Sequence, residues 1–218
     1  MKRPGPLLTL HAGLLLGLFM LTLNATTGTK NASSSYREES PAPTASPPRT
    51  TTPPPGPTPS RTPVRDADYA GRTDDDAAAV AVSVRNGRAI AYFCDGRAKE
   101  SWLKGDVKDD GSMKLTGRHG TELDGKLQEG RRIRGTVDID GGHFAFTADK
   151  AVKPSGLWRA TATVRGAKID GGWIVLRDGR QVGLLDRDGK PSAAPRIDPV
   201  TGAVTVDGQQ LTARPVTP

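Results

Sequence analysis

Short dipeptides that favour tight turns recur throughout the chain after residue 85. Asp-Gly occurs eight times and Asn86-Gly87 once; the Asp-Gly pairs begin at Asp95, Asp110, Asp124, Asp140, Asp170, Asp178, Asp188 and Asp207. Asn, Asp and Gly tolerate the positive φ angles that two-residue hairpin turns require. Signals spaced about 10 to 20 residues apart leave room for short strands and for few helices. The spacing therefore predicts an antiparallel β structure.

Between these turn signals, apolar and polar residues alternate with the two-residue period of a strand. In segment 132–139, for example, the residues on one face are Ile133, Gly135, Val137 and Ile139. The sequence predicts an all-β domain, an antiparallel meander of about 8 to 11 short strands. A closed barrel and a two-sheet sandwich both protect strand edges, so both architectures fit the pattern.

The first hairpin allows a residue-by-residue prediction. If Asn86-Gly87 is a two-residue turn, Val80, Val82 and Val84 lie opposite Phe93, Ala91 and Ala89 on one face of the hairpin. On the other face, Ala79, Ala81 and Ser83 lie opposite Cys94, Tyr92 and Ile90. Both faces are then largely apolar. We expect this hairpin to be covered on both sides and to lie centrally in the fold.

Proline divides the chain into parts. Ten of the 18 prolines fall between Pro41 and Pro63, in a stretch that is otherwise rich in Thr and Ser. Such a composition cannot bury a core and predicts a disordered stalk over residues 26–67. An N-terminal segment, residues 1–25, precedes the stalk. Residues 68–218 follow it and are long enough for one ordinary domain.

The N-terminal segment has the composition of an export signal. Lys2 and Arg3 precede an apolar run of 17 residues, 7–23, which predicts a hydrophobic helix with a cytoplasmic N-terminus and an exported remainder. Leu23-Asn24-Ala25 is a poor cleavage site, so an uncleaved signal anchor and a cleaved signal peptide both remain open. The only cysteine is Cys94, which excludes a lipid anchor after the run. We expect a membrane-anchored domain outside the cell, or a secreted one.

The net charge of +7 does not indicate a nucleic-acid partner. Residues up to Asp68 carry +3 of it, so the domain carries only +4, and its basic and acidic residues are interleaved. The densest basic cluster, Arg131, Arg132 and Arg134, is typical of a solvated hairpin end.

One segment resembles a known group of proteins. Tyr92-Phe93-Cys94-Asp95-Gly96, followed by Trp102-Leu103-Lys104-Gly105, is similar to a Y-x-C-D-G … W-x-x-G signature. This signature occurs in exported actinobacterial proteins with a Pro/Thr-rich linker and a C-terminal β domain. The similarity extends through segments 133–137 and 144–146 to 206–208. The resemblance implies an exported location and a β architecture, and it implies no catalytic residue.

Catalytic and metal-binding motifs are missing from the sequence. His119 and His143 both lie beside glycine in expected turns, with no G-x-S-x-G elbow and no H-x-x-x-H or C-x-x-C spacing. Asp138-Ile-Asp140-Gly141 and Asp186-Arg-Asp188-Gly189 lack the closing glutamate of a calcium loop and predict hairpin turns. We therefore assign no catalytic residue, metal or cofactor.

The signature residues form the candidate binding locus: Tyr92, Cys94, Asp95 and Trp102. Tyr92, Asp95 and Trp102 could form the rim of a site, although core and turn roles suit the same residues. A lone cysteine in an oxidising compartment is a buried small hydrophobe, a free thiol or an intermolecular link.

Three functions fit these observations. The leading hypothesis is a non-enzymatic extracytoplasmic β domain that binds a small ligand, a cell-wall polymer or an envelope protein. The second is a secreted hydrolase that uses carboxylates such as Glu100, Glu122 and Glu129. The third is a structural or sensory ectodomain of an envelope assembly.

Overall fold

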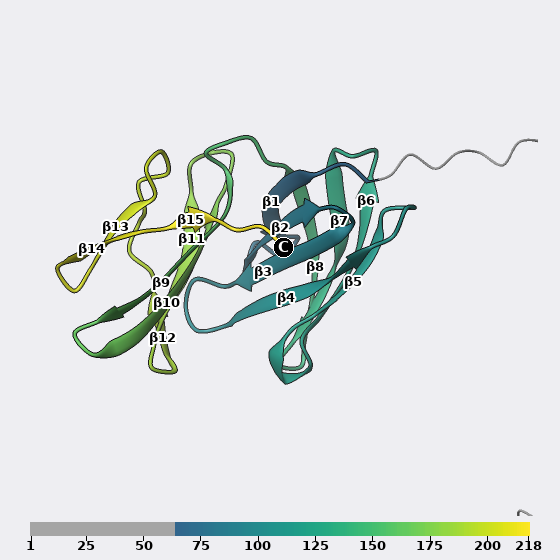
Figure 1. The fold of residues 1–218 in the computed structure, drawn as a ribbon. Coiled ribbons are helices and arrows are strands. Elements are labelled where there is room, and N and C mark those ends of the chain that lie inside the picture. Colours follow the sequence, from purple (N-terminus) through teal and green to yellow (C-terminus); the bar gives the residue numbers. More distant parts are fainter. Residues whose placement is uncertain (1–63) are drawn as a thin grey trace, which may run out of the picture. The chain divides into compact units, whose positions relative to one another are not determined.

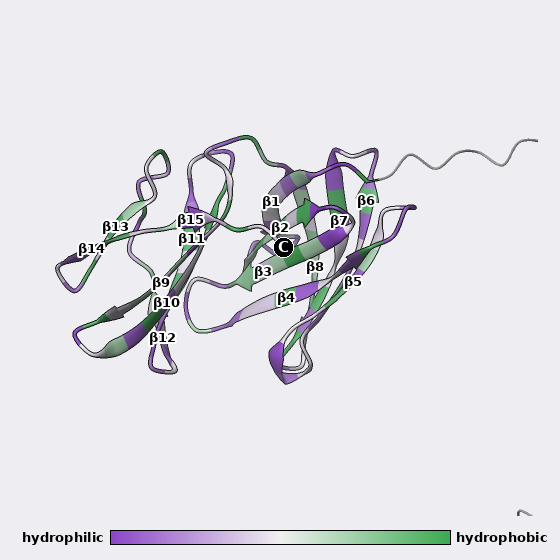
Figure 2. Cartoon of the chain, viewed as in Figure 1, coloured by the Kyte–Doolittle hydropathy of each residue, from purple (hydrophilic) through white to green (hydrophobic). Residues whose placement is uncertain are grey.

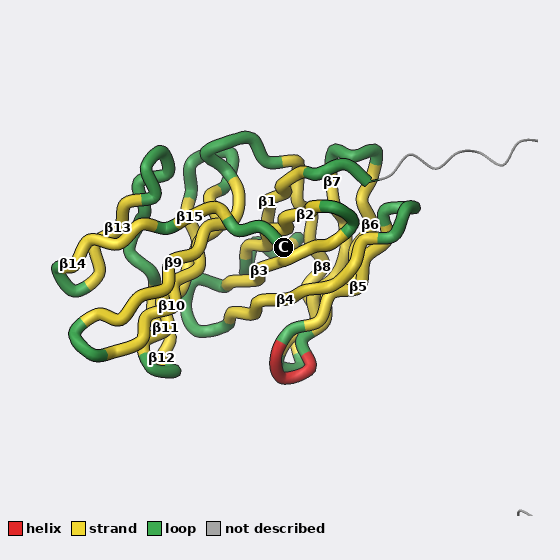
Figure 3. The backbone as a smooth tube through the Cα atoms, viewed as in Figure 1, coloured by secondary structure: helices red, strands yellow, loops and turns green. Residues whose placement is uncertain are grey.

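The computed structural model describes residues 64–218. The expected hydrophobic helix, with its apolar run 7–23, lies outside the described residues, as does the stalk up to residue 63. Within residues 64–218, no helix is long and apolar enough to cross a membrane. Strands and turns make up almost all of this part, and the one helical element is a single 3-10 turn, η1 (Arg118–Gly120) (Figure 3). The all-β prediction is confirmed.

The first eight strands pair with their neighbours in chain order and close into an antiparallel barrel, in which β8 returns to β1 (Figure 1). They are β1 (Ala67–Thr73), β2 (Ala79–Arg85), β3 (Arg88–Cys94), β4 (Glu100–Val107), β5 (Ser112–Thr116), β6 (Glu122–Gln128), β7 (Arg132–Ile139) and β8 (Gly142–Lys150). The meander is therefore a closed barrel, which leaves no free strand edge.

The remaining strands form two further sheets. A five-stranded sheet, which we call the second sheet, has the order β12-β11-β10-β9-β15, and a separate hairpin pairs β13 with β14. Their bounds are β9 (Gly156–Val164), β10 (Ala167–Val175), β11 (Gln181–Arg187), β12 (Lys190–Ala193), β13 (Ala203–Val206), β14 (Gln209–Thr212) and β15 (Arg214–Pro215). Fifteen strands exceed the 8 to 11 predicted, because short pieces such as β12 and β15 are exposed and show no alternation.

The first hairpin has the predicted register. Val80 pairs with Phe93, Val82 with Ala91 and Val84 with Ala89. These side chains enter the core inside the barrel, whose members are buried, such as Phe93 and Leu115. Side chains therefore fill the interior of the barrel, as is usual for a barrel of eight strands. The interior is not an open cavity that could carry a ligand. In Figure 2, β3 is coloured as hydrophobic along much of its length, whereas the turn that contains η1 is hydrophilic.

The outer face of the same hairpin is also covered. Ala79, Ala81, Tyr92 and Cys94 pack with Leu157, Ile174 and Leu184 of the second sheet. One face of this hairpin therefore packs in the core inside the barrel, and the other packs against the second sheet. This is the cover on both sides that the sequence pattern predicts. The second sheet has a core of its own on its other face, which includes Trp173 and Val175.

Two of the predicted turns are wrong. Asp124-Gly125 lies within β6, and Asp170-Gly171 lies within β10. In β10 the glycines provide space: a Cβ on Gly171 would lie 2.3 Å from Trp173 Cη2, and one on Gly172 would lie 2.6 Å from Tyr92 Cζ. Gly171 faces the core of the second sheet and Gly172 faces the barrel, because successive residues of a strand point to opposite faces. The motifs around Asp140 and Asp188 do form the predicted hairpin turns, each with positive φ.

Candidate functional site

The structure brings three of the four predicted locus residues together. Tyr92 on β3 lies directly opposite Trp102 on β4, and their ring centroids are 4.3 Å apart. Cys94 lies on the same face of β3, opposite Glu100. Tyr92 and Cys94 are fully buried beneath the second sheet, and Trp102 is partly buried. These residues hold the barrel and the second sheet together, and a ligand could reach Tyr92 or Cys94 only if the two separated.

Asp95 has a different role. Its carboxylate accepts hydrogen bonds from the backbone N–H groups of Arg97, Ala98 and Lys99, at 2.7, 2.9 and 3.0 Å. Partial burial alone would raise the pKa of Asp95, but these three donors hold it below its ordinary value. This acceptor pattern fixes the loop between β3 and β4. The carboxylate is therefore occupied within its own loop.

Cys94 is a buried free thiol. Burial raises the pKa of its thiol to about 12, against a smaller lowering effect of the Gly96 N–H, which lies 3.3 Å from Sγ. A thiol must ionise before it can act as a nucleophile or exchange disulfides. Of the three roles considered for this residue, the structure therefore supports the small buried hydrophobe.

Charged groups border the junction between the barrel and the second sheet. The Tyr92 hydroxyl donates a hydrogen bond to Glu100. Arg159 on β9 forms an ion pair with Asp170 on β10, and its guanidinium carbon lies 4.5 Å from the centroid of the Trp102 ring. This geometry allows a cation–π interaction. Glu100, Arg159 and Asp170 thus surround the aromatic pair with polar groups that are mutually satisfied.

Burial raises the pKa of Glu100, and the nearby Asp170 and Asp186 add to this effect, while the Tyr92 hydrogen bond and Arg159 oppose it. A raised pKa means that folding favours the protonated carboxyl, so this contribution to stability is full below the ordinary pKa and is lost as the pH rises through the raised value. Glutamine stays neutral at every pH. We therefore expect Glu100→Gln to remove this part of the pH dependence of the free energy of unfolding.

Urea denaturation of the wild type and Glu100→Gln across pH 3.5–7.5 measures this effect. The stability of the variant relative to the wild type should increase with pH. Glu129→Gln is the matched control, since Glu129 lies exposed in a turn and pairs with Arg131. Parallel profiles for the wild type and Glu100→Gln would contradict the prediction.

The three carboxylates of the hydrolase hypothesis do not form one site. Glu100 accepts from Tyr92, whereas Glu122 pairs with Lys114 and Glu129 with Arg131. The histidines lie in different elements: His119 lies in η1, and His143 on β8 contacts Asp138 at 2.6 Å. Among residues 64–218, no group of three or more His, Cys, Asp or Glu side chains is placed to hold a metal ion.

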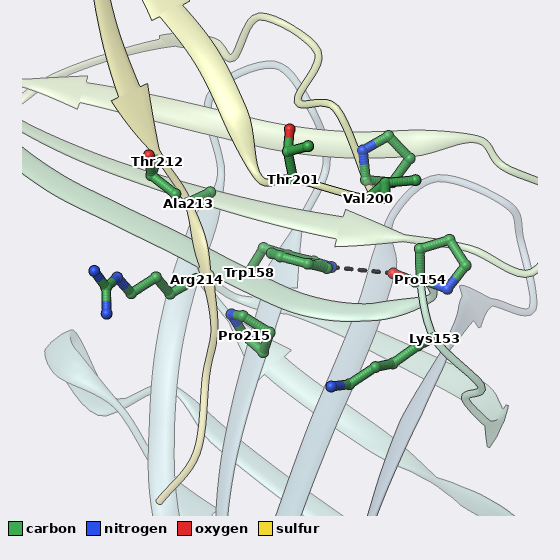
Figure 4. A pocket seen from close by; sticks show the side chains of 10 residues that line it. Lys153, Pro154, Trp158, Val200, Thr201, Thr212, Ala213, Arg214 and Pro215 are labelled. Atoms are coloured by element: carbon green, nitrogen blue, oxygen red, sulfur yellow. Dashed lines mark hydrogen bonds between the residues drawn. The ribbon is translucent and has the colours of Figure 1, made fainter.

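A groove of about 800 Å³ lies beside the second sheet, and no sequence motif predicts it. We call it the Trp158 groove. It is lined by Lys153, Pro154, Trp158, Pro199, Val200, Thr201, Thr212, Ala213, Arg214 and Pro215 (Figure 4). These residues come from the β8–β9 connection, β9, the turn before β13 and the segment from the end of β14 through β15. Because four segments build the groove, no contiguous motif marks it.

Two fixed turns form its borders. The Trp158 indole N–H donates to the Pro154 carbonyl at 3.2 Å, so this hydrogen bond joins the β8–β9 connection to β9 (Figure 4). The carboxylate of Asp198 accepts the N–H groups of Val200 and Thr201 at 2.8 and 3.2 Å. These bonds lower the pKa of Asp198. The second turn is thereby held with Val200 facing solvent.

An exposed apolar side chain, that of Val200, lines this groove. In the described part of the chain, the two exposed large hydrophobic residues are Val152 and Val200, with 65% and 83% of their surface accessible. Val200 lines the groove, and Val152 directly precedes Lys153 in the turn that ends with the Ser155 N–H bonded to the Val152 carbonyl. Apolar clefts with a few polar groups are typical of binding sites.

Comparison of the chain with protein-family models, with curated proteins and with solved structures found no match. The class is therefore defined by the fold alone, an all-β protein with a closed eight-stranded antiparallel barrel and a second sheet packed on the outer face of β2 and β3.

Proposed function

We propose that the chain is a non-enzymatic extracytoplasmic binding protein. In this proposal residues 1–25 direct export and either remain as an anchor or are cleaved, the stalk acts as a spacer, and the β domain binds an envelope component through the Trp158 groove. The single observation that carries the proposal is the position of Val200, a large hydrophobic side chain that is 83% exposed and lines this groove.

The site geometry supports binding over catalysis. The groove lining contains Lys, Arg and Thr but no Asp, Glu, His, Cys or Ser, so its threonine hydroxyls have no carboxylate or imidazole beside them to act as a base. At the junction, Glu100 accepts a hydrogen bond from Tyr92, and Arg159 pairs with Asp170, so each of these ionisable groups already has a partner. A hydrolase would need a base and an accessible reacting site in the same place.

Sedimentation of the full-length protein, kept in detergent so that residues 1–25 cannot insert into membrane, with the detergent-washed insoluble envelope fraction of its own host tests the proposal. Val200→Asn removes an exposed apolar contact without adding charge or disturbing a core, so we expect the bound fraction to fall several-fold. Thr163→Asn is the matched control, because Thr163 is exposed on β9 and does not line the groove. Equal sedimentation of Val200→Asn and the wild type would refute the groove as the binding site.

A further inference from the structure

One edge of the second sheet is only partly covered. β9 pairs with β10 along its whole length, but β15 pairs with only two of its residues, Trp158 and Arg159. β13 and β14 form a separate hairpin and do not extend the sheet. Among residues 64–218, the outer edge of β9 from Ala160 to Val164 therefore has no partner strand, and we call it the free edge.

Backbone hydrogen-bonding groups point outward from the free edge. The Leu157 carbonyl accepts the Val216 N–H at 3.0 Å, on the side of β15. In an antiparallel sheet the backbone groups of successive residues point to opposite sides of the strand, so those of Thr161 and Thr163 point to the same side as those of Leu157. No backbone hydrogen bond from another segment of the described chain reaches them. These two residues thus offer N–H and C=O groups to a further strand.

The opposite edge of the sheet is protected, whereas the free edge is not. β12 carries Lys190 and Pro191, and charged residues and proline at an edge discourage pairing with another chain. The free edge has the sequence Ala-Thr-Ala-Thr-Val, without charge or proline, and Thr and Val favour strands. Both threonines are exposed. The free edge therefore suits the addition of a strand.

Two arginines flank the free edge. Arg165 follows it in the β9–β10 turn, and Arg214 on β15 lies opposite Arg159 at its other end. The side chains of Arg165 and Arg214 are exposed, and neither takes part in an ion pair within residues 64–218. Figure 4 shows the Arg214 side chain directed away from the other residues of the Trp158 groove. A strand with acidic residues at both ends would bring carboxylates to these two cations.

A second copy of this chain does not meet the same requirement. The symmetric register of two free edges places Thr161 of one copy opposite Thr163 of the other. Arg165 of the second copy would then reach the place opposite Arg159 that Arg214 already occupies. Like charges brought together destabilise a strand pair. The charges therefore favour an acidic segment of a different protein.

From the outward backbone groups and the two flanking arginines, we infer that the free edge binds an extended acidic segment of a partner protein as an additional β-strand. Main-chain hydrogen bonds provide the affinity in this mode of recognition, and Arg165 and Arg214 bind the acidic side chains. Replacing a threonine side chain leaves these main-chain groups in place. The lining of the Trp158 groove includes none of residues 160–164, so this inference goes beyond the proposed function.

A synthetic peptide tests the inference with the full-length protein in mild detergent. The peptide alternates threonine and valine between a pair of glutamates at each end. Fluorescence anisotropy should show saturable binding that weakens when the salt concentration rises from 50 to 500 mM. Deuterium exchange at the amides of the free edge should slow in the complex. No binding, or binding without this protection, would overturn the inference.

Two altered peptides separate the contributions. Methylation of all the backbone nitrogens removes the N–H donors and should abolish binding. Lysine in place of glutamate should weaken binding by about tenfold or more. Equal binding by either altered peptide would contradict the inference.

Proline variants of the protein locate the site. Thr161→Pro removes an outward N–H, a change that an edge strand tolerates, and should weaken binding several-fold. Ala193→Pro is the matched control on β12, where the N–H of the next residue, Ala194, bonds inward to the Gly183 carbonyl and that of Ala193 points outward. This control should bind the peptide as the wild type does. Equal binding by the two proline variants would refute the free edge as the site.

The charge requirement has its own variants. Arg165→Glu with Arg214→Glu should weaken binding of the acidic peptide by about tenfold or more. Arg177→Glu with Lys190→Glu makes the same change in charge at exposed positions elsewhere on the sheet and should bind as the wild type does. Unchanged binding by the first double variant would refute an acidic partner.

Sedimentation velocity distinguishes a second copy as the occupant. We expect the wild type and Thr161→Pro to have the same oligomeric state. Self-association of the wild type that Thr161→Pro abolishes would show that the free edge binds another copy of this chain, and the assignment of an acidic partner segment would then be wrong.

Discussion

Trp173→Ala should lower the free energy of unfolding by about 3–5 kcal/mol, the range for removal of a large buried aromatic side chain. The indole is almost fully buried in the core of the second sheet. Its N–H donates to the Pro195 carbonyl at 2.7 Å, so the truncation also leaves a partly buried acceptor without its donor.

Two glycines lie beside the Trp173 ring and leave space for it. Gly183 lies directly opposite on β11, and Gly171 is two residues before it on the same face of β10. A Cβ on Gly183 would lie 2.9 Å from Trp173 Cδ1, and one on Gly171 would lie even closer to the far end of the ring. A smaller side chain cannot fill the space that the two glycines leave, so we expect a cavity to persist.

Urea denaturation followed by circular dichroism measures the loss. Trp173→Phe should give an intermediate value, because it keeps part of the ring contacts and loses the rest together with the hydrogen bond to Pro195, and it provides a measurement if the alanine variant does not accumulate. Thr161→Ala, exposed on the neighbouring β9, is the control and should change stability by no more than about 0.5 kcal/mol. A loss below about 1 kcal/mol for Trp173→Ala would contradict this account of the core.

The first hairpin was predictable because its information is local. Asn86-Gly87 fixes a two-residue loop, and the loop length fixes which residues of β2 and β3 lie opposite one another. The two apolar faces then required a cover on both sides. The sequence could not show that the outer cover would be β9, β10 and β11, since that contact joins segments about 80 residues apart.

The related dipeptide Asp-Gly failed as a turn signal at Asp170-Gly171. Gly is favoured by a positive φ angle and also by a lack of space, and sequence alone does not separate these causes. In β10 the cause is space, because ring atoms occupy the positions where side chains of Gly171 and Gly172 would lie. A tryptophan two residues after the first glycine is the one local hint that this pair lies in a strand.

The Trp158 groove was beyond prediction for a related reason. Lys153, Val200 and Arg214 belong to no recognisable sequence motif. Residues of these types are common in loops. Only the pairing of β15 with β9 brings Arg214 and Pro215 beside Arg159 and Trp158. For the signature residues the reverse is true, because their motif is easily recognised in the sequence. The structure places Tyr92, Cys94 and Trp102 at the junction between the barrel and the second sheet, and Asp95 in a loop.

Gly172→Val should lower the free energy of unfolding by about 1–3 kcal/mol or more and should loosen the junction between the barrel and the second sheet. A Cβ at this position would lie 2.6 Å from Tyr92 Cζ and 2.8 Å from Trp102 Cζ2. Neither ring is free to move aside, because Tyr92 is fully buried, bonded to Glu100 and stacked against Trp102. The strain must therefore move β10 away from the barrel.

Cys94 reports this movement directly. In the wild type the thiol is buried at the junction, and burial raises its pKa to about 12, so a thiol reagent at pH 8 should label it only after unfolding. In Gly172→Val we expect labelling under native conditions, together with a lower urea midpoint. Thr161→Val, a β-branched substitution at an exposed position of β9, should leave both quantities unchanged. An unlabelled Cys94 and an unchanged midpoint in Gly172→Val would show that the second sheet does not depend on this contact, and the role assigned to Tyr92 and Trp102 would then be wrong.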